Sequence, residues 1–459
     1  MRRRNAMLIR ALARLALGAV VMGVSAALAQ VTDPGVRKAA TDGGPPPPLP
    51  GLSAEQLLFF QDGLQRFQEI ESVSNGLGPR FNSNQCSSCH SQPFVGGSSP
   101  AANPLYSVVN AAGATNQMPW FIAPNGPVRE VRFVSSNGAP DGGVHDLFVI
   151  SGRSDVASCN LTQPNFLPAG DPLSGRGGNR NLVFRIPTPT FGEGLIEAIP
   201  DSVILANVIA DAATKQSLGV FGHPNANVGG TVNRSANDGT ITRFGWKAQN
   251  KSLLVFAGEA YNVEMGVSNQ VFPQERDDGP GCQTGVNVPN DGINMPDPAQ
   301  PLSAVAVLSD TEAFAMFMRL LAPPQPAAPS RSSTHGAAVF ASVGCALCHR
   351  PMMTTGSVGD PAFTNQPVRL YSDLLVHRMG VGLADGITQG GAGPDEFRTA
   401  PLWGLGQRVF FLHDGRTSDL LQAIAAHASP GSEASRVVWN FGELSPQDQQ
   451  DLLNFLRSL

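Results

Sequence analysis

Two short segments of the sequence carry the residue types and the spacing needed to attach a haem covalently. Cys86–His90 reads CSSCH and Cys345–His349 reads CALCH, so both match the pattern Cys-x-x-Cys-His. In this pattern two thiols about one helical turn apart bond the vinyl-derived carbons of one porphyrin, and the adjacent histidine ligates the iron. We therefore expect two covalently bound c-type haems, held by six residues: Cys86, Cys89, His90, Cys345, Cys348 and His349.

Two other uses of paired cysteines explain the pattern less well. A thioredoxin-type redox pair gives no reason for the histidine that follows each pair, and one copy would suffice. A four-cysteine zinc site usually has its pairs within a few tens of residues, whereas 259 residues separate Cys86 from Cys345. Two haem sites therefore account best for the two copies.

The first 29 residues have the pattern of an export signal. Five arginines precede or flank the start of the apolar run Leu15–Ala26, and Ala27 to Ala29 form a small-residue cleavage site. We expect cleavage near Ala29 and a periplasmic protein; an uncleaved membrane anchor is the alternative. The 31 Lys and Arg less these five leave 26 basic against 36 acidic residues, a net charge of about −10. Such a charge argues against nucleic-acid binding.

The two remaining cysteines, Cys159 and Cys282, lie in Gly- and Asn-rich segments. Four of the six cysteines are assigned to haem, which leaves at most one disulfide. In an oxidising compartment a structural disulfide between Cys159 and Cys282 is the preferred interpretation, and a free reactive thiol is the alternative.

The elements that must position these motifs are helices joined by long loops. The 50 glycines and 38 prolines in 459 residues indicate many loops, and 42% apolar content argues against both disorder and a polytopic membrane protein. Capping residues and apolar periodicity predict helices starting at Ser53, at Thr311–Leu321, at His335–Val343 and after Ser445. Short strands are expected at Val128–Val134, Leu147–Ser151 and Leu182–Ile186.

Proline-rich stretches divide the chain. Residues 30–51 and 322–331 are the expected linkers, because proline and small residues dominate there. They bound an N-terminal haem domain at 52–321, enlarged by loop insertions, and a C-terminal haem domain at 332–459.

Several further segments resemble bacterial di-haem cytochrome c peroxidases, from about residue 52 to the C-terminus. The chain is most similar to the di-haem oxidoreductases of that superfamily, through Ile186–Pro189, Gly194–Pro200, Thr242–Gln249, Arg398–Gly404 and Phe411–Arg416. The resemblance implies a mainly α fold with two cytochrome c-like haem domains, long Gly/Pro-rich loops and minor β structure in the N-terminal domain. It also implies an oxidoreductase.

The second axial ligand decides whether a haem transfers electrons or binds a substrate. His427 lies on the apolar face of an expected helix, Ser418–Ala428, 14 residues after His413. The di-haem peroxidases have an axial methionine at that spacing, so the resemblance implies that His427 is the sixth ligand of the C-terminal haem. Met379 is the competing ligand, and His413 is expected to be a hydrogen-bonding residue of the haem crevice.

The N-terminal haem has no matching distal histidine. The peroxidases keep one in a loop after the first motif, whereas this chain has none between His90 and His145, and His145 and His223 match no pattern. We therefore expect this iron to be open to peroxide or dioxygen, which makes it the reactive one.

Two residues are expected to support this chemistry. Asn262–Gly266 (NVEMG) resembles the segment that carries the distal acid/base of the peroxidases, which implies that role for Glu264; Glu259 is the fallback. A carboxylate in an apolar pocket can carry the proton that peroxide cleavage requires. Trp246 resembles the tryptophan that conducts electrons between the haems, and a core tryptophan is the alternative. Candidate partners for haem propionates are Arg243, Lys247, Arg398 and Arg416.

The sequence thus predicts a periplasmic di-haem c-type oxidoreductase with peroxidase-like chemistry. A small redox protein is the expected electron donor or acceptor, and peroxide or a small organic molecule is the expected substrate. Two alternatives stay open: a non-enzymatic electron-transfer protein, and an oxygenase or protein-modifying enzyme related to the rubber oxygenases or to the methylamine-utilisation maturation enzyme. A calcium ion (Ca2+) between the domains and the oligomeric state are also left open.

Overall fold

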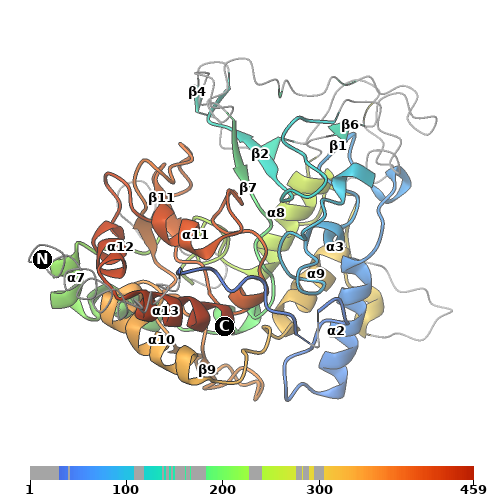
Figure 1. Ribbon diagram of the computed structural model, residues 1–459. Helices are drawn as coiled ribbons and strands as arrows, with labels where there is room; N and C mark the ends of the chain where they lie inside the picture. Colours follow the sequence, from blue (N-terminus) through green and yellow to red (C-terminus); the bar gives the residue numbers. More distant parts are fainter. Residues whose placement is uncertain are drawn as a thin grey trace, which may run out of the picture.

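The computed structural model describes residues 30–39, 42–107, 118–136, 139–140, 144–145, 148–149, 161, 166, 182–226, 240–274, 282, 289–293 and 304–459. Within these residues the protein is mainly helical, with small sheets of two or three strands (Figure 1). None of the described helices is long and apolar enough to cross a membrane. The export signal expected at residues 1–29 lies outside the described residues.

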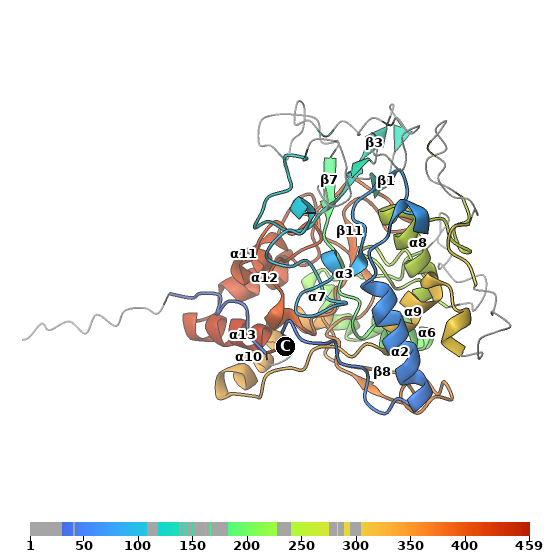
Figure 2. The same cartoon turned by 90° about the vertical axis from the view of Figure 1, so that its right-hand side faces the viewer.

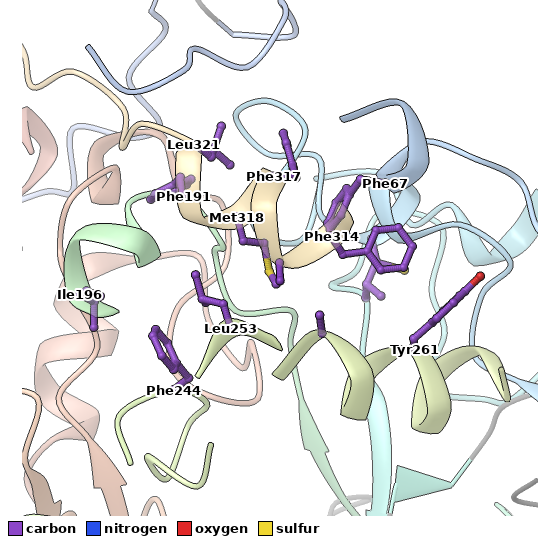
Figure 3. Packing of buried hydrophobic residues seen from close by; sticks show 14 of the residues in the cluster. Phe67, Phe191, Ile196, Phe244, Leu253, Tyr261, Phe314, Phe317, Met318 and Leu321 are labelled. Atoms are coloured by element: carbon purple, nitrogen blue, oxygen red, sulfur yellow. The ribbon is translucent and has the colours of Figure 1, made fainter. Parts of the chain in front are cut away.

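The N-terminal half is built around three packed helices, α2 (Ala54–Phe67), α8 (Leu253–Met265) and α9 (Asp310–Leu320). As predicted, Ser53 caps α2 in a capping box with Gln56, which satisfies backbone N–H groups at the helix start. The helix predicted at Thr311–Leu321 is confirmed by α9. Rings from the three helices meet in the core, where Figure 3 shows Phe67, Phe314 and Tyr261 close together.

The C-terminal half is built around a second group of helices: α10 (Arg331–Val343), α11 (Leu420–Ala426), α12 (Ser435–Gly442) and α13 (Pro446–Ser458). Both views of the molecule place this group on the opposite side from α2 and α8 (Figures 1 and 2). The predicted helices at His335–Val343 and after Ser445 are confirmed. The helix expected at Ser418–Ala428 is shorter, because Asp419 caps its start and His427 already forms its C-cap.

Shorter elements connect these two groups of helices. They are the helices α3 (Cys86–Cys89), α5 (Glu193–Glu197), α6 (Asp201–Ile209) and α7 (Ala212–Leu218), and 3-10 turns at Val73–Asn75, Ala304–Val307, Cys345–Leu347 and Leu405–Gln407. Both haem-attachment motifs therefore begin with a single short helical turn, at Cys86 and at Cys345.

The strands of the described residues pair antiparallel. One sheet has the order β5-β2-β7, formed by Val144–His145, Glu130–Phe133 and Leu182–Arg185. The two-stranded pairs are β1 (Arg80–Phe81) with β6 (Phe148–Val149), β3 (Ser135–Ser136) with β4 (Ala139–Pro140), β8 (Met353–Thr354) with β9 (Pro367–Val368), and β10 (Val376–Arg378) with β11 (Glu396–Arg398). The strands predicted at Val128–Val134 and Leu182–Ile186 are confirmed by β2 and β7. The expectation of β structure in the N-terminal domain alone is incomplete, since β8 to β11 follow residue 332.

The two halves share core packing across the expected linker at 322–331. The buried cluster of the N-terminal half also takes in Met353, Phe363 and Leu375, which follow that linker in the chain. The C-terminal helices have a separate cluster that includes Phe340 and Phe455. Residues beyond the linker therefore complete the N-terminal core, which a division by composition does not reveal.

The proline-rich segment 30–51 packs against both halves. Asp33 forms a buried ion pair with Arg457 of α13 at 2.7 Å. Farther along, Pro48 forms a β-bridge with Leu321, just after α9. The segment therefore ties α13 to the end of α9, although the sequence suggested a linker with no core of its own.

A close helix contact in the C-terminal half yields a stability prediction. Gly336 of α10 is buried, and a Cβ atom added there would collide with the carbonyl oxygen of Asp451 in α13. We expect Gly336→Ala to destabilise the fold by about 1–3 kcal/mol, the usual range for overpacking, and to lower the midpoint of urea unfolding. Gly442→Ala is the matched control, because nothing lies within 4 Å of its added Cβ. Equal midpoints for the two variants would contradict the packing described.

Candidate functional site

The first attachment motif lies in the wall of an open cavity with an empty volume of about 1210 Å³. Nδ1 of His90 lies 3.1 Å from the carbonyl oxygen of Gly97, so Nδ1 carries the hydrogen and Nε2 is left to ligate a metal. Burial lowers the pKa of His90 to about 4, against backbone bonds to Gly97 and Thr188 that favour the charged form. His90 is therefore a neutral imidazole, the form that binds iron.

The end of α8 is fixed against the loop that leads into this motif. Gly266 ends α8 with φ +72°, and a Cβ there would lie 2.6 Å from Cα of Gly78, so the two chains touch at glycines. The backbone N–H of Asn82 donates to the carbonyl of Glu264 at 2.6 Å. This close approach brings Glu264 into the lining of the first cavity together with Glu259.

Glu259 and Cys89, both in the lining of the first cavity, interact with neighbouring groups of the protein. The Glu259 carboxylate accepts a hydrogen bond from the side-chain amide of Asn250. Burial, together with the nearby charge of Glu264, raises the pKa of the Cys89 thiol to about 12. A protonated, buried thiol is a poor redox nucleophile, which argues against the thioredoxin-type interpretation.

Three arginines, Arg129, Arg132 and Arg185, line the first cavity and were not singled out by the sequence. Arg129 directly precedes β2, Arg132 belongs to β2 and Arg185 belongs to β7. None of them is part of a sequence motif, and the pairing of β2 with β7 brings them together. Among the described lining residues His90 is the only histidine. Met265 also lies there, with its sulfur 3.9 Å from the sulfur of Cys86.

The second attachment motif lines another open cavity, with an empty volume of about 1410 Å³. Nδ1 of His349 lies 3.0 Å from the carbonyl oxygen of Tyr371, and Nδ1 of His427 lies 2.7 Å from that of Ala423. Burial lowers the pKa of His349 to about 4 and also lowers the pKa of His427. The cavity therefore offers two neutral imidazoles, each with Nε2 left for an iron.

Three other residues of the second cavity, Met379, His377 and His413, differ in their surroundings. Met379 lines it as well. His377 also lines it, but its ring is held between Asp373 at 3.0 Å and Glu433 at 2.9 Å. His413 lines it too and stacks on Phe397 with ring centres 4.2 Å apart, and its expected hydrogen-bonding role in a haem crevice stays a prediction.

Trp246 lies where the two cavities meet. Its side chain lines both of them, and its indole N–H donates to the carbonyl of Ile186 at 3.0 Å. The edge of its ring faces His413, with ring centres 6.4 Å apart. The structure thus places one fixed aromatic ring at the border of both sites.

Of the four cations proposed from sequence as propionate partners, Arg398 lines the second cavity. The others are held by protein groups elsewhere. Arg243 bonds the carbonyls of Ile196 and Ile199 and pairs with Asp201, Lys247 pairs with Asp385, and Arg416 pairs with Asp414. Arg408, which the sequence analysis missed, lines the second cavity beside Arg398.

The cysteines do not form a zinc site. The two motifs line different cavities, and no group of three or more His, Cys, Asp or Glu suited to a metal ion occurs among the described residues. Cys282 is disulfide-bonded, so the free thiol considered for it is wrong, while its expected partner Cys159 lies outside the described residues. The four motif cysteines are free thiols, which is the state that haem attachment consumes.

Of the two histidines that match no pattern, only His223 has a described side chain. His223 pairs with Glu396 at 3.3 Å and lines neither cavity. His145 belongs to β5, and its side chain lies outside the described part of the structure. Taken with the neutral histidines, each cavity has two cysteines and a histidine in its lining, the donor set that a c-type haem requires.

Residues 178–459 match the model of a protein family described as "Di-haem oxidoreductase, putative peroxidase". The matched part contains the second attachment motif, Trp246, Glu264 and His427, and it begins after the first motif. No curated protein sequence matches the chain.

Solved structures show weaker likenesses. Hydrazine synthase of Kuenenia stuttgartiensis is 19% identical with a TM-score of 0.22, over 34% of this chain and 56% of that one. A MauG-like protein associated with microbial copper homeostasis is 20% identical with a TM-score of 0.23, over 35% and 58%. The diheme peroxidase BthA from Burkholderia thailandensis is 15% identical with a TM-score of 0.28, over 47% and 65%. In these three comparisons the chain spans less than two thirds of the matched structure.

Proposed function

This chain belongs to the di-haem oxidoreductase family, and we propose that it is an exported c-type enzyme that reduces peroxide at its N-terminal haem and passes electrons through its C-terminal haem. One observation carries the proposal, namely the asymmetry of the two cavities. Among the described lining residues the first has a single histidine and three carboxylates, Glu130, Glu259 and Glu264, and the second has His349 with His427. Two histidines suit electron transfer, whereas one histidine leaves an iron position for a substrate.

At the first cavity the chain's own residues would hold the haem and move the proton. Cys86 and Cys89 would bind the porphyrin, His90 would ligate the iron, and such a haem supplies the electrons and the Lewis acid needed to cleave peroxide. Glu264 would take the proton from the peroxide oxygen that faces the iron site and give it to the other oxygen, which would then leave as water. Arg129, Arg132 and Arg185 line this cavity but already have protein partners, so the propionates would have to share them: Arg129 donates to the carbonyls of Asp414 and Gly415, Arg132 pairs with Glu130, and Arg185 pairs with Asp385.

At the second cavity the residues would keep the iron closed to substrate. Cys345 and Cys348 would bind the porphyrin, and His349 and His427 would both ligate the iron. Arg398 and Arg408 are the cations available to its propionates among the described lining residues. Trp246, which borders both cavities, would carry electrons between them.

Further parts of this proposal concern the whole protein. Removal of residues 1–29 would leave the mature protein in the periplasm, folded as two cytochrome c-like haem domains. A small redox protein would exchange electrons with the C-terminal haem. Calcium would act between the halves, and a chelator that left the visible spectrum and the rate of peroxide reduction unchanged would remove it from the proposal.

Spectroscopy of the haem-loaded protein tests the function directly. We expect one high-spin and one low-spin haem, binding of carbon monoxide by the reduced protein, and a change of the visible spectrum on adding stoichiometric peroxide. Two low-spin haems that bind no carbon monoxide and do not respond to peroxide would instead identify an electron carrier. Consumption of dioxygen with an organic substrate, but not of peroxide, would identify an oxygenase.

The position of Trp246 gives a separate prediction. In Trp246→Phe the reaction with peroxide should begin normally, but oxidation of the C-terminal haem should be slowed, because the ring that borders both cavities loses its indole. Stopped-flow spectra that resolve the two haems provide the measurement. Trp439→Phe is the control, since Trp439 is 53% exposed on α12. Unchanged kinetics in Trp246→Phe would show that electrons take another route.

A further inference from the structure

A third, smaller cavity lies beside Trp246 and is used by no step described above. It has an empty volume of about 360 Å³, and four of its lining residues also line the second haem cavity, namely Trp246, Ala400 and the two cations Arg398 and Arg408. Glu193 lines it from the first turn of α5. We call this cavity the Glu193 chamber, and its remaining described lining residues are Thr188, Pro189, Phe191, Ile196, Pro401 and Trp403.

The chamber has a defined shape. Gly192, just before α5, has φ +74°, and a Cβ there would lie 2.6 Å from the ring of Trp403. Its backbone N–H donates to the carbonyl of Leu321 at 2.8 Å. These contacts hold the start of α5 against Trp403 and the end of α9, so the backbone position of Glu193 is fixed.

The polar atoms of the chamber are incompletely paired. Glu193 is 3% exposed and Arg398 is 7% exposed, yet Oε2 of Glu193 and Nη1 of Arg398 have no hydrogen-bond partner in the described structure. A buried polar atom without a hydrogen-bond partner is energetically unfavourable, so the buried carboxyl of Glu193 does not stabilise the fold at this position.

The charges around Glu193 come from each element packed against it. Arg398 at the end of β11 attracts its carboxylate, and Glu197 on its own helix repels it. Glu197 is itself paired with Arg319 of α9 at 2.7 Å, and Arg408 lines the chamber from the segment after the last 3-10 turn. Burial raises the pKa of Glu193 to about 8, so the group can change its protonation near neutral pH.

We propose that Glu193 is a proton-uptake site coupled to the C-terminal haem, so that each electron that reduces this haem is accompanied by binding of a proton to Glu193. This inference rests on the proposed function only in placing a haem in the second cavity. Arg398 and Arg408 border both that cavity and the chamber. An electron added to the haem offsets part of their positive charge, so the electrostatic potential at Glu193 becomes less positive. The Glu193 carboxylate then binds a proton from solvent, and the electron comes from an external one-electron reductant.

The coupling has a defined sign. Because reduction raises the proton affinity of Glu193, protonation must by linkage raise the electron affinity of the haem. The midpoint potential should therefore fall as pH rises between the pKa of Glu193 in the oxidised protein and its higher pKa in the reduced protein. Full coupling changes the equilibrium constant tenfold per pH unit, which corresponds to about 59 mV for one electron.

Potentiometric titration of the haem-loaded full chain between about pH 6 and about pH 9 tests the proposal. Wild type should show a falling potential at the low-spin haem, and Glu193→Gln should remove most of that slope. Glu197→Gln is the matched control, because it lies on the same helix but pairs with Arg319 outside the chamber, and it should keep the slope. A wild-type slope in Glu193→Gln would overturn the proposal.

Proton counting on the wild-type protein keeps the test independent of the variant's stability. Reduction in weakly buffered solution with a pH indicator should show uptake of up to about half a proton per electron at about pH 8, where Glu193 is already half protonated in the oxidised protein, and uptake nearer to about one proton per electron about one pH unit higher. No uptake at either pH would overturn the proposal. Neither measurement uses peroxide. A protein that takes up the proton but fails to reduce peroxide would contradict the peroxidase function and support this inference.

Discussion

Replacing Glu264 with glutamine should lower the rate of peroxide reduction by about 10²- to 10⁴-fold, the usual contribution of a general acid–base. Glutamine keeps the size of the side chain, but its amide cannot act as an acid or a base near neutral pH. Peroxide should therefore still bind while cleavage of its O–O bond slows. Stopped-flow spectra at increasing peroxide concentrations separate these steps. We expect the saturating rate to fall much more than the affinity for peroxide.

Glu259→Gln is the matched control for this prediction. Both side chains line the first cavity and both belong to α8, but the Glu259 carboxylate is held by the amide of Asn250. We expect Glu259→Gln to retain most of the wild-type rate. The reverse result, a large loss in Glu259→Gln and none in Glu264→Gln, would transfer the acid/base role to Glu259.

Replacing His427 with methionine should raise the reduction potential of the C-terminal haem by on the order of 100 mV or more, within the roughly 0.8 V that axial ligands span. A thioether donates less charge to the oxidised iron than an imidazole does, so the reduced state gains relative stability. Potentiometry of the low-spin haem measures the change. The C-terminal haem should also give up the second electron needed for peroxide reduction less readily.

Met379→Leu is the control for His427→Met. Met379 lines the same cavity and is the competing ligand, so its replacement should leave the potential and the low-spin spectrum unchanged if His427 ligates the iron. A shift of the spectrum in Met379→Leu together with a normal His427→Met protein would assign the sixth position to Met379.

The elements and motifs that depend on local interactions could be read from the sequence. Ser53 and Ser445 mark helix starts because a side-chain oxygen and the backbone N–H groups it caps are only three residues apart. The attachment motifs are equally local, since the chemistry needs two cysteines and a histidine within five residues. Composition likewise separates a loop-rich chain from a membrane or disordered one.

Residues that act together across the chain were harder to predict. Arg408 stands in no motif, and its role at the second cavity follows from a 3-10 turn that places it beside Arg398. Arg243 looked equivalent to Arg398 by charge alone, but its guanidinium donates to the backbone carbonyls of Ile196 and Ile199, in α5 and just beyond it. Burial and competing partners decide such cases, and both are properties of the folded chain.

The sequence by itself determined that the chain can hold two haems, because covalent attachment is a short-range requirement written in ten residues. It also pointed to Glu264, Trp246 and His427 through their resemblance to a known family. Only the tertiary structure decided that Trp246 borders both cavities, that segment 30–51 binds the two halves, and that Glu193 is buried beside two arginines. These relations join residues far apart in the chain, and only packing fixes them.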